Sequence, residues 1–246
     1  ALPMTVFEQL QAVGEKYQAG YLVLVDPDRL KQHDIPRFGQ QAQSAGVDAL
    51  LLGGSFLTND LSLIAETLQI STDLPIILFP GSAMQLTSYA DAIFFMSLIS
   101  GRNPNYLISE QVRAAPLIQK QGLEPIPTGY LLIDGGTQTS VSFISNTTPI
   151  PRDKFEIAWA HALAGQYLGM QLIYLEAGSG AEIPVPDLMI SSVKKQVSVP
   201  IIVGGGIRSP ETARQKVEAG ADFIVTGNVI EKDLSLMSAF AEAIHG

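Results

Sequence analysis

The stretch PIIVGGGIRSPETARQKVEAGADFIVTGN, residues 200–228, contains two short apolar runs that are separated by one segment of helical character. The runs at residues 200–203 and 223–226 are rich in β-branched residues and have the length of buried strands. Residues 210–219 predict the helix that connects them. The order strand, helix, strand predicts a βαβ unit, whose two strands run parallel.

The same alternation of short strands and helices extends upstream through the chain. Six further strands are predicted at residues 21–25, 49–52, 75–79, 92–96, 129–133 and 171–175. Further helices are expected at residues 104–121, 153–168 and 229–244, and the connection after Phe79 is expected to be short or irregular. Eight parallel strands in 246 residues favour an α/β fold with one (β/α)8 TIM barrel, modified at its third crossover, and residues 1–246 as a single domain.

An open, doubly wound sheet is the alternative fold. Such a sheet usually carries its phosphate site in a glycine-rich turn after the first strand, whereas the glycine clusters of this chain come late. Residues 137–151 are rich in Thr, Ser, Asn and Pro without a helical period, and they predict an inserted loop after the fifth strand. Loops at this end of the strands line the mouth of a barrel.

Composition excludes several classes of function. The net charge is −9 with only 15 Lys and Arg residues, so no surface for nucleic acid is expected. The chain has no cysteine, and His33, His161 and His245 are scattered, which argues against a transition-metal site. No apolar run approaches the ~18 residues that a membrane span needs, so we predict a soluble protein of the cytoplasm without an integral membrane segment.

Glycines follow the predicted strands seven and eight, and each group stands directly before a helix. They are Gly204, Gly205 and Gly206 in the first group, and Gly227 with Asn228 in the second. Glycines let backbone amides approach phosphate oxygens, and a helix N-terminus adds favourable partial charge. The pair of motifs predicts a phosphate site at the position where barrels commonly have one, and the alternative is that the glycines only make tight turns.

Polar side chains follow three other strands. Tyr174 and Glu176 end the sixth strand and lie on the same face of it, so Glu176 is a candidate general base and Tyr174 a candidate hydrogen-bond donor to the substrate. A structural salt bridge is the alternative for Glu176. Asp26 and Ser55 follow the neighbouring strands one and two, where a carboxylate and a hydroxyl suit Mg²⁺. Asp28 has the alternative role of capping a turn.

Five motifs together resemble the geranylgeranylglyceryl phosphate synthase family: Asp-Pro-Asp at 26–28, Gly-Gly-Ser at 53–55, Tyr-Leu-Glu-Ala-Gly-Ser-Gly-Ala at 174–181, Gly-Gly-Gly-Ile-Arg at 204–208 and Thr-Gly-Asn at 226–228. The resemblance implies a modified (β/α)8 barrel that joins sn-glycerol 1-phosphate to a long prenyl diphosphate with Mg²⁺. Segments 96–100 and 137–151 resemble the longer members, which act on geranylgeranyl diphosphate, more than the compact heptaprenyl ones.

The resemblance also implies roles for individual residues. Asp26 and Ser55 would hold Mg²⁺, and Glu176 would be the base. Glycerol 1-phosphate would be enclosed by Tyr174, Leu175, Glu176, Ala177, Gly178, Ser179, Gly180, Gly204, Gly205, Gly206, Gly227 and Asn228. The family often has Lys where this chain has Arg29, so the role of Arg29 is left open.

The prenyl chain needs an apolar groove, for which Phe94, Phe95 and Tyr106 are the candidates. Ordinary core packing is the alternative for these rings. The competing functions are an isomerase or lyase of amino-acid biosynthesis with the same phosphate site, a heptaprenylglyceryl phosphate synthase, and a non-catalytic phosphate-binding protein. A homo-oligomer is expected, because barrels with apolar outer helices often self-associate.

Overall fold

The computed structural model describes residues 3–82 and 85–246. Eight parallel strands close into a barrel in chain order, and β8 pairs with β1. The strands are β1 Gly20–Val25, β2 Ala49–Leu52, β3 Ile76–Leu78, β4 Ala92–Leu98, β5 Glu124–Leu132, β6 Leu172–Glu176, β7 Ile201–Gly204 and β8 Phe223–Thr226. The predicted barrel is confirmed, and so is the number of its strands.

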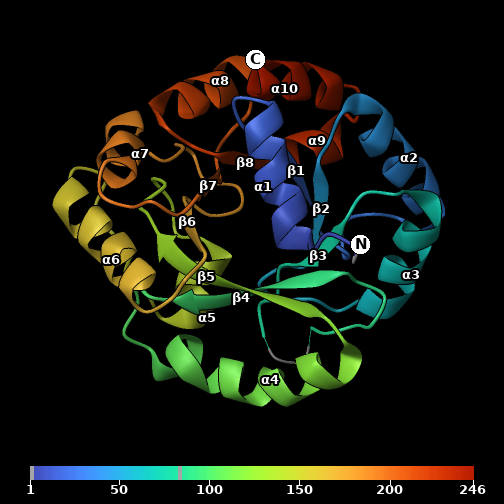
Figure 1. The fold of residues 1–246 in the computed structure, drawn as a ribbon, viewed down its shortest axis with the longest axis horizontal. Coiled ribbons are helices and arrows are strands. Elements are labelled where there is room, and N and C mark those ends of the chain that lie inside the picture. The colour runs from blue at the N-terminus through green and yellow to red at the C-terminus, as the bar shows by residue number, and fades with distance from the viewer. Residues whose placement is uncertain (1–2, 83–84) are drawn as a thin grey trace.

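Helices surround the barrel as a ring (Figure 1). The ring consists of α2 Ile35–Ala45, α3 Leu61–Ser71, α4 Glu110–Gln121, α6 Phe155–Tyr167, α7 Asp187–Lys194, α8 Pro210–Ala219 and α10 Leu236–His245. Shorter helical segments are the 3-10 turn η1 Gln32–Asp34, the π-turn η2 Asn105–Ser109, α5 Ser140–Ser145 and α9 Asn228–Lys232. One helix, α1 Val6–Lys16, lies across the centre of the barrel in Figure 1.

Helix α1 covers the end of the barrel at which the strands begin. Its N-terminus is closed by a capping box between Thr5 and Glu8, and the Glu124 carboxylate at the start of β5 accepts hydrogen bonds from the next two backbone N–H groups, at 2.6 and 3.0 Å. Val6 and Leu10 insert into the barrel interior. This helix was not among those predicted from the sequence.

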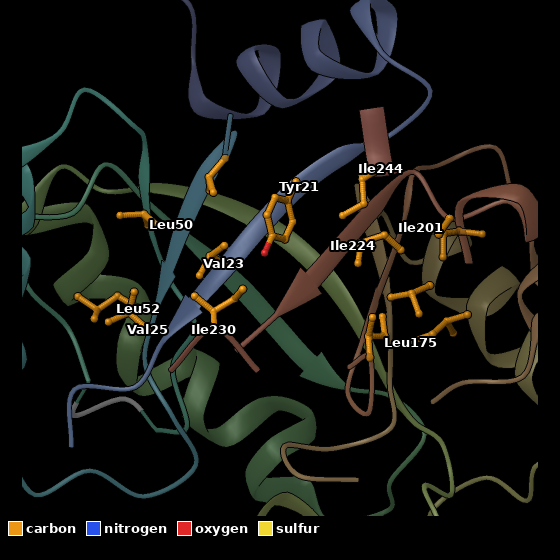
Figure 2. Packing of buried hydrophobic residues seen from close by; sticks show 14 of the residues in the cluster. Tyr21, Val23, Val25, Leu50, Leu52, Leu175, Ile201, Ile224, Ile230 and Ile244 are labelled. Carbon is orange, nitrogen blue, oxygen red and sulfur yellow. The ribbon is translucent and has the colours of Figure 1, made fainter. Parts of the chain in front are cut away.

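Alternation along each strand divides the core into two layers. One set of side chains packs in the barrel interior, together with α1: Leu22, Leu51, Ile77, Phe94, Ile126, Leu172, Tyr174, Ile202 and Val225. The other set packs between the strands and the ring of helices (Figure 2): Tyr21, Val23, Val25, Leu50, Leu52, Leu175, Ile201, Ile224, Ile230 and Ile244. Both faces of every strand are therefore buried, which explains why the strands read as continuous apolar runs.

Strand β5 begins at Glu124, five residues before the predicted start at 129. Pro125 and Pro127 obscure its beginning, since proline has no N–H group for a ladder. The N–H group of Glu124 donates to Asp91 on the β4 side, so the two prolines, one and three residues further, face the β6 side. Pairing with β6 begins only at Thr128, and the missing N–H groups interrupt no ladder there.

One predicted helix and one predicted loop differ from the structure. The helix expected at 229–244 is divided into α9 and α10, because Asp233 adopts an extended conformation and its carboxylate accepts hydrogen bonds from Ser235. The loop expected at 137–151 contains the short helix α5, which begins with a capping box of Thr139 and Ser142. The irregular third crossover is confirmed: residues 79–82 and 85–91, the described part of that connection, contain no helix.

Candidate functional site

A cavity of about 620 Å³ lies at the end of the barrel where the strands end. Its wall contains most of the predicted site residues: Asp26, Ser55, Tyr174, Glu176, Ser179, Gly180, Gly205, Gly206, Gly227 and Asn228. The fold thus brings together the ends of five strands that are far apart in the sequence. Leu175 and Ala177 pack instead in the layer between strands and helices, so their side chains do not face the cavity.

Glu176 is a carboxyl group buried at the base of this cavity. Its side chain is among the few charged ones that the barrel buries, and the residue is 6% exposed. Burial raises the pKa of Glu176 to about 7; the 2.8 Å hydrogen bond from the Gly178 N–H group lowers the pKa but is outweighed. The nearby hydroxyls of Tyr174 and Tyr130 also lower it. A carboxyl group with this pKa can accept a proton from a ligand near neutral pH.

Tyr174 lies in a cluster of aromatic rings beside Glu176. Its ring centroid is 5.4 Å from that of Phe79 and 5.4 Å from that of Tyr130. The Tyr174 hydroxyl is fully buried and makes no hydrogen bond of regular geometry among the described residues, although it lies near enough to Glu176 to lower the pKa of that carboxyl. A ligand could complete its hydrogen bonding, since leaving a buried hydroxyl unpaired costs about 1–3 kcal/mol. Gly204 leaves room for it, because a Cβ atom there would lie 2.6 Å from the hydroxyl oxygen.

The glycines after β7 form a tight turn against the sixth-strand loop. Gly205 and Gly206 have φ angles of +89° and +72°, which side chains rarely adopt. A Cβ atom at Gly205 would also lie 2.6 Å from Oε1 of Glu176. Within residues 3–82 and 85–246, no group accepts a hydrogen bond from the backbone N–H of Gly206 or of Asn228. Both residues line the same cavity, and free backbone N–H groups of this kind are suited to bind an anion.

Asp26, Arg29 and Asn228 are linked at the rim of the cavity, where the loops after the neighbouring strands β1 and β8 meet. Arg29 Nε lies 3.5 Å from Oδ2 of Asp26, and Arg29 Nη1 lies 3.3 Å from Oδ1 of Asn228. The same Nη1 atom lies 3.1 Å from Oε2 of Glu231. The Asp28 carboxylate accepts hydrogen bonds from Thr58 and Asn59, so it ties the loop after β1 to the loop after β2 and caps no turn of its own segment.

The ends of β1 and β2 offer one carboxylate and one hydroxyl to a cation. A Cβ atom at Gly54 would lie 3.9 Å from Oδ2 of Asp26, so this carboxylate lies next to the residue that precedes Ser55. No group of three or more His, Asp or Glu side chains in the described chain is arranged to hold a metal ion. This donor set fits Mg²⁺, which keeps several waters and takes further oxygens from substrate phosphates. Magnesium binding stays a prediction.

A smaller, mainly apolar cavity of about 110 Å³ adjoins the first. Its wall includes the three predicted groove residues, Phe94, Phe95 and Tyr106. Phe94 is also fully buried in the barrel interior, so it has a packing role as well. The two cavities share five residues: Gly54, Ser55, Phe79, Tyr130 and Val141. A ligand with a polar head and an apolar tail could therefore occupy both.

A family model described as the PcrB family matches residues 11–244. The chain belongs to the PcrB family. This PcrB chain is 51% identical to the geranylgeranylglyceryl phosphate synthase of Chitinophaga pinensis, over 92% of this chain and 90% of that protein. It is 48% identical to the protein of the same name in Thermococcus gammatolerans, over 89% and 87%.

A solved structure with the same enzyme name as the sequence relatives also resembles this chain. A crystal structure of (S)-3-O-geranylgeranylglyceryl phosphate synthase from Thermoplasma acidophilum, in complex with its substrate sn-glycerol-1-phosphate, superposes on this PcrB chain with a TM-score of 0.93. The two chains are 36% identical, and the superposition covers 99% of each. These relatives do not favour an isomerase or lyase. No helix in the described part of the PcrB chain is long and apolar enough to cross a membrane.

Three residues that line both cavities were not predicted as site residues, namely Phe79, Tyr130 and Val141. Tyr130 shares the inner face of β5 with Leu132. The strand predicted at 129–133 already contained Tyr130, so alternation along that strand was the available signal. Phe79 follows β3 directly, which is a second available signal. Val141 lies on α5, in a segment that the sequence predicted to be irregular.

Proposed function

We propose that this protein is a geranylgeranylglyceryl phosphate synthase. It transfers the geranylgeranyl group of geranylgeranyl diphosphate to the C3 hydroxyl of sn-glycerol 1-phosphate, forming an ether and releasing diphosphate. One observation carries the proposal: Glu176, a buried carboxyl with a pKa of about 7, lines the same cavity as the free backbone N–H groups, and this cavity adjoins an apolar one. The names of the relatives and of the solved structure support the same reaction.

The polar cavity binds glycerol 1-phosphate in this mechanism. The backbone N–H groups of Gly206 and Asn228 donate to the phosphate oxygens, and the Tyr174 hydroxyl supplies a further donor. Glu176 then faces the C3 hydroxyl and takes its proton as the C3 oxygen bonds to C1 of the prenyl group. Holding the two reactants in a fixed orientation also lowers the activation free energy, by up to about 7–11 kcal/mol in well-oriented reactions.

The bond from C1 of the prenyl group to the diphosphate oxygen breaks in the same reaction, and the diphosphate leaves with both bonding electrons. Asp26 and Ser55 would hold Mg²⁺ at this end of the cavity. When bound, Mg²⁺ neutralises negative charge on the leaving diphosphate. The rings of Phe79 and Tyr130 exclude water from the junction between the two cavities, so that water does not compete with the glycerol hydroxyl.

The apolar cavity takes the first part of the prenyl chain. Phe94, Phe95 and Tyr106 form part of its wall, and Met96 and Ile144 add further apolar surface.

We propose a cytoplasmic enzyme that forms a homo-oligomer. Large exposed apolar side chains support self-association, in particular Phe143 on α5 at 72% exposed and Val112 on α4 at 63%.

The test is incubation with sn-glycerol 1-phosphate, Mg²⁺ and one prenyl diphosphate at a time, from geranyl to heptaprenyl, with mass analysis of ether products. The proposal expects the geranylgeranyl ether as the preferred product. Preferred formation of the heptaprenyl ether would show a different chain-length class. Binding of glycerol 1-phosphate with no ether from any donor would instead favour the non-catalytic phosphate-binding protein.

A further inference from the structure

Arg29 is the cation that connects the loop after β1 to the loop after β8. Its Nε atom lies 3.5 Å from Oδ2 of Asp26, on its own loop. Its Nη1 atom reaches across to Oδ1 of Asn228 at 3.3 Å and to Oε2 of Glu231 at 3.1 Å. The guanidinium therefore touches a proposed magnesium ligand on one side and a proposed glycerol phosphate ligand on the other.

The contacts of Asn228 determine which way its amide group points. Oδ1 of Asn228 accepts two hydrogen bonds, from Arg29 Nη1 and from the Ser179 hydroxyl, both at 3.3 Å. The amide nitrogen is consequently on the opposite side, where it would lie 3.5 Å from a Cβ atom on Gly180. A rotated amide would place its N–H groups against the guanidinium, which has donors only. The positive charge of Arg29 therefore keeps the Asn228 amide in one orientation.

We propose that Arg29 is a positioning residue that orients the Asn228 amide nitrogen toward the phosphate of the bound substrate. This role rests on the proposed function, since it needs glycerol 1-phosphate in the cavity. Arg29 is not itself a phosphate ligand, because its guanidinium already lies between two carboxylates. A planar guanidinium suits the task, as two of its nitrogens donate in different directions, whereas lysine has one nitrogen at the end of a flexible chain.

The test measures calorimetric binding of sn-glycerol 1-phosphate alone to the full chain and to variants. Arg29→Met is expected to weaken binding about 3- to 10-fold, the effect of one misdirected hydrogen bond to a charged group. Asn228→Ala is expected to weaken it at least as much. Because Arg29 acts through Asn228, the double variant is expected to bind no more weakly than Asn228→Ala alone.

Two controls separate positioning from a merely structural role. Glu231→Gln removes one ion pair of Arg29 but leaves its bond to Asn228, so binding of glycerol 1-phosphate is expected to be unchanged. Arg29→Lys is expected to bind glycerol 1-phosphate more tightly than Arg29→Met and less tightly than the wild type. If Arg29→Met does not fold, Arg29→Lys replaces it in the test. The KM for geranylgeranyl diphosphate is expected to stay the same in Arg29→Met.

Three results would overturn the role of Arg29: unchanged binding in Arg29→Met, losses that multiply in the double variant, or a loss confined to the KM for geranylgeranyl diphosphate. The last result would make Arg29 a ligand of the diphosphate. A wild-type protein that binds no glycerol 1-phosphate would instead refute the proposed function, and the role of Arg29 with it. If the wild type binds glycerol 1-phosphate and any of these three results is obtained, the role of Arg29 is refuted and the proposed function is not.

Discussion

Replacing Glu176 by Gln is expected to stabilise the fold at high pH while removing most of the activity. Burial raises the pKa of this carboxyl from the ordinary value of 4.5 to about 7. The folded state therefore binds the proton more tightly than the unfolded state does, and folding stability falls as the pH rises between these two values. The free-energy cost of ionising the buried carboxyl is absent below pH 4.5 and fully present above pH 7.

The pKa difference for Glu176 corresponds to about 3 kcal/mol in the free energy of unfolding. Gln has the same shape, keeps an oxygen that can accept the hydrogen bond from the Gly178 N–H group, and cannot ionise. The wild type and Glu176→Gln should therefore be similarly stable near pH 4.5, and the variant should be more stable by about 3 kcal/mol at pH 8.5.

Urea unfolding of both proteins between pH 4.5 and 8.5 measures this difference, and all other titrating groups cancel in the comparison. In the same variant kcat should fall by about 100- to 10,000-fold, the usual contribution of a general base, while binding of glycerol 1-phosphate stays nearly intact. In the wild type kcat should rise with pH, with the midpoint of the rise at about 7. A stability difference that is the same at every pH would contradict this prediction, since it would mean that Glu176 is not buried as a charged group at high pH.

Three further predictions concern other parts of the molecule. Asp26→Asn should sharply raise the Mg²⁺ concentration needed for half-maximal activity, and unchanged metal dependence would show that Asp26 has a structural role only. Tyr106→Ala should open the apolar cavity and so increase kcat/KM for heptaprenyl diphosphate relative to that for geranylgeranyl diphosphate. If the ratio of the two kcat/KM values is unchanged and the melting temperature is lower, Phe94 or Phe95 limits the cavity instead. Glu124→Ala should lower the free energy of unfolding by about 1–3 kcal/mol, because two N–H groups of α1 lose their acceptor. The kcat of the same variant should not change, since α1 covers the end of the barrel opposite the site.

The strands were predictable because their residues are buried on both faces. The starts and ends of β2 and β8 agree with the apolar runs to the residue, since polar residues or glycine border each run. The start of β5 was not predictable by the same rule. Its two prolines are tolerated only because no neighbouring strand needs their N–H groups, and this depends on where β6 begins.

The candidate site was partly predictable from the order of strands. In a parallel barrel all strands end on one side, so Asp26, Ser55, Glu176 and Asn228 were expected to meet there, and they line one cavity. The partners of these side chains were not predictable. Arg29 contacts Asn228 and Glu231 across about 200 residues of chain, a contact that depends on the closure of β8 against β1.

The order and periodicity of residues along the chain were enough to predict the barrel, the side on which its polar residues gather, and the glycine turns after β7 and β8. How acidic Glu176 is depends on the folded chain, since the pKa is set by the atoms that exclude water from the carboxyl group. The same holds for the unpaired Tyr174 hydroxyl and for the apolar cavity beside Tyr130. Each is a property of the space between elements, and residues distant in the sequence form that space.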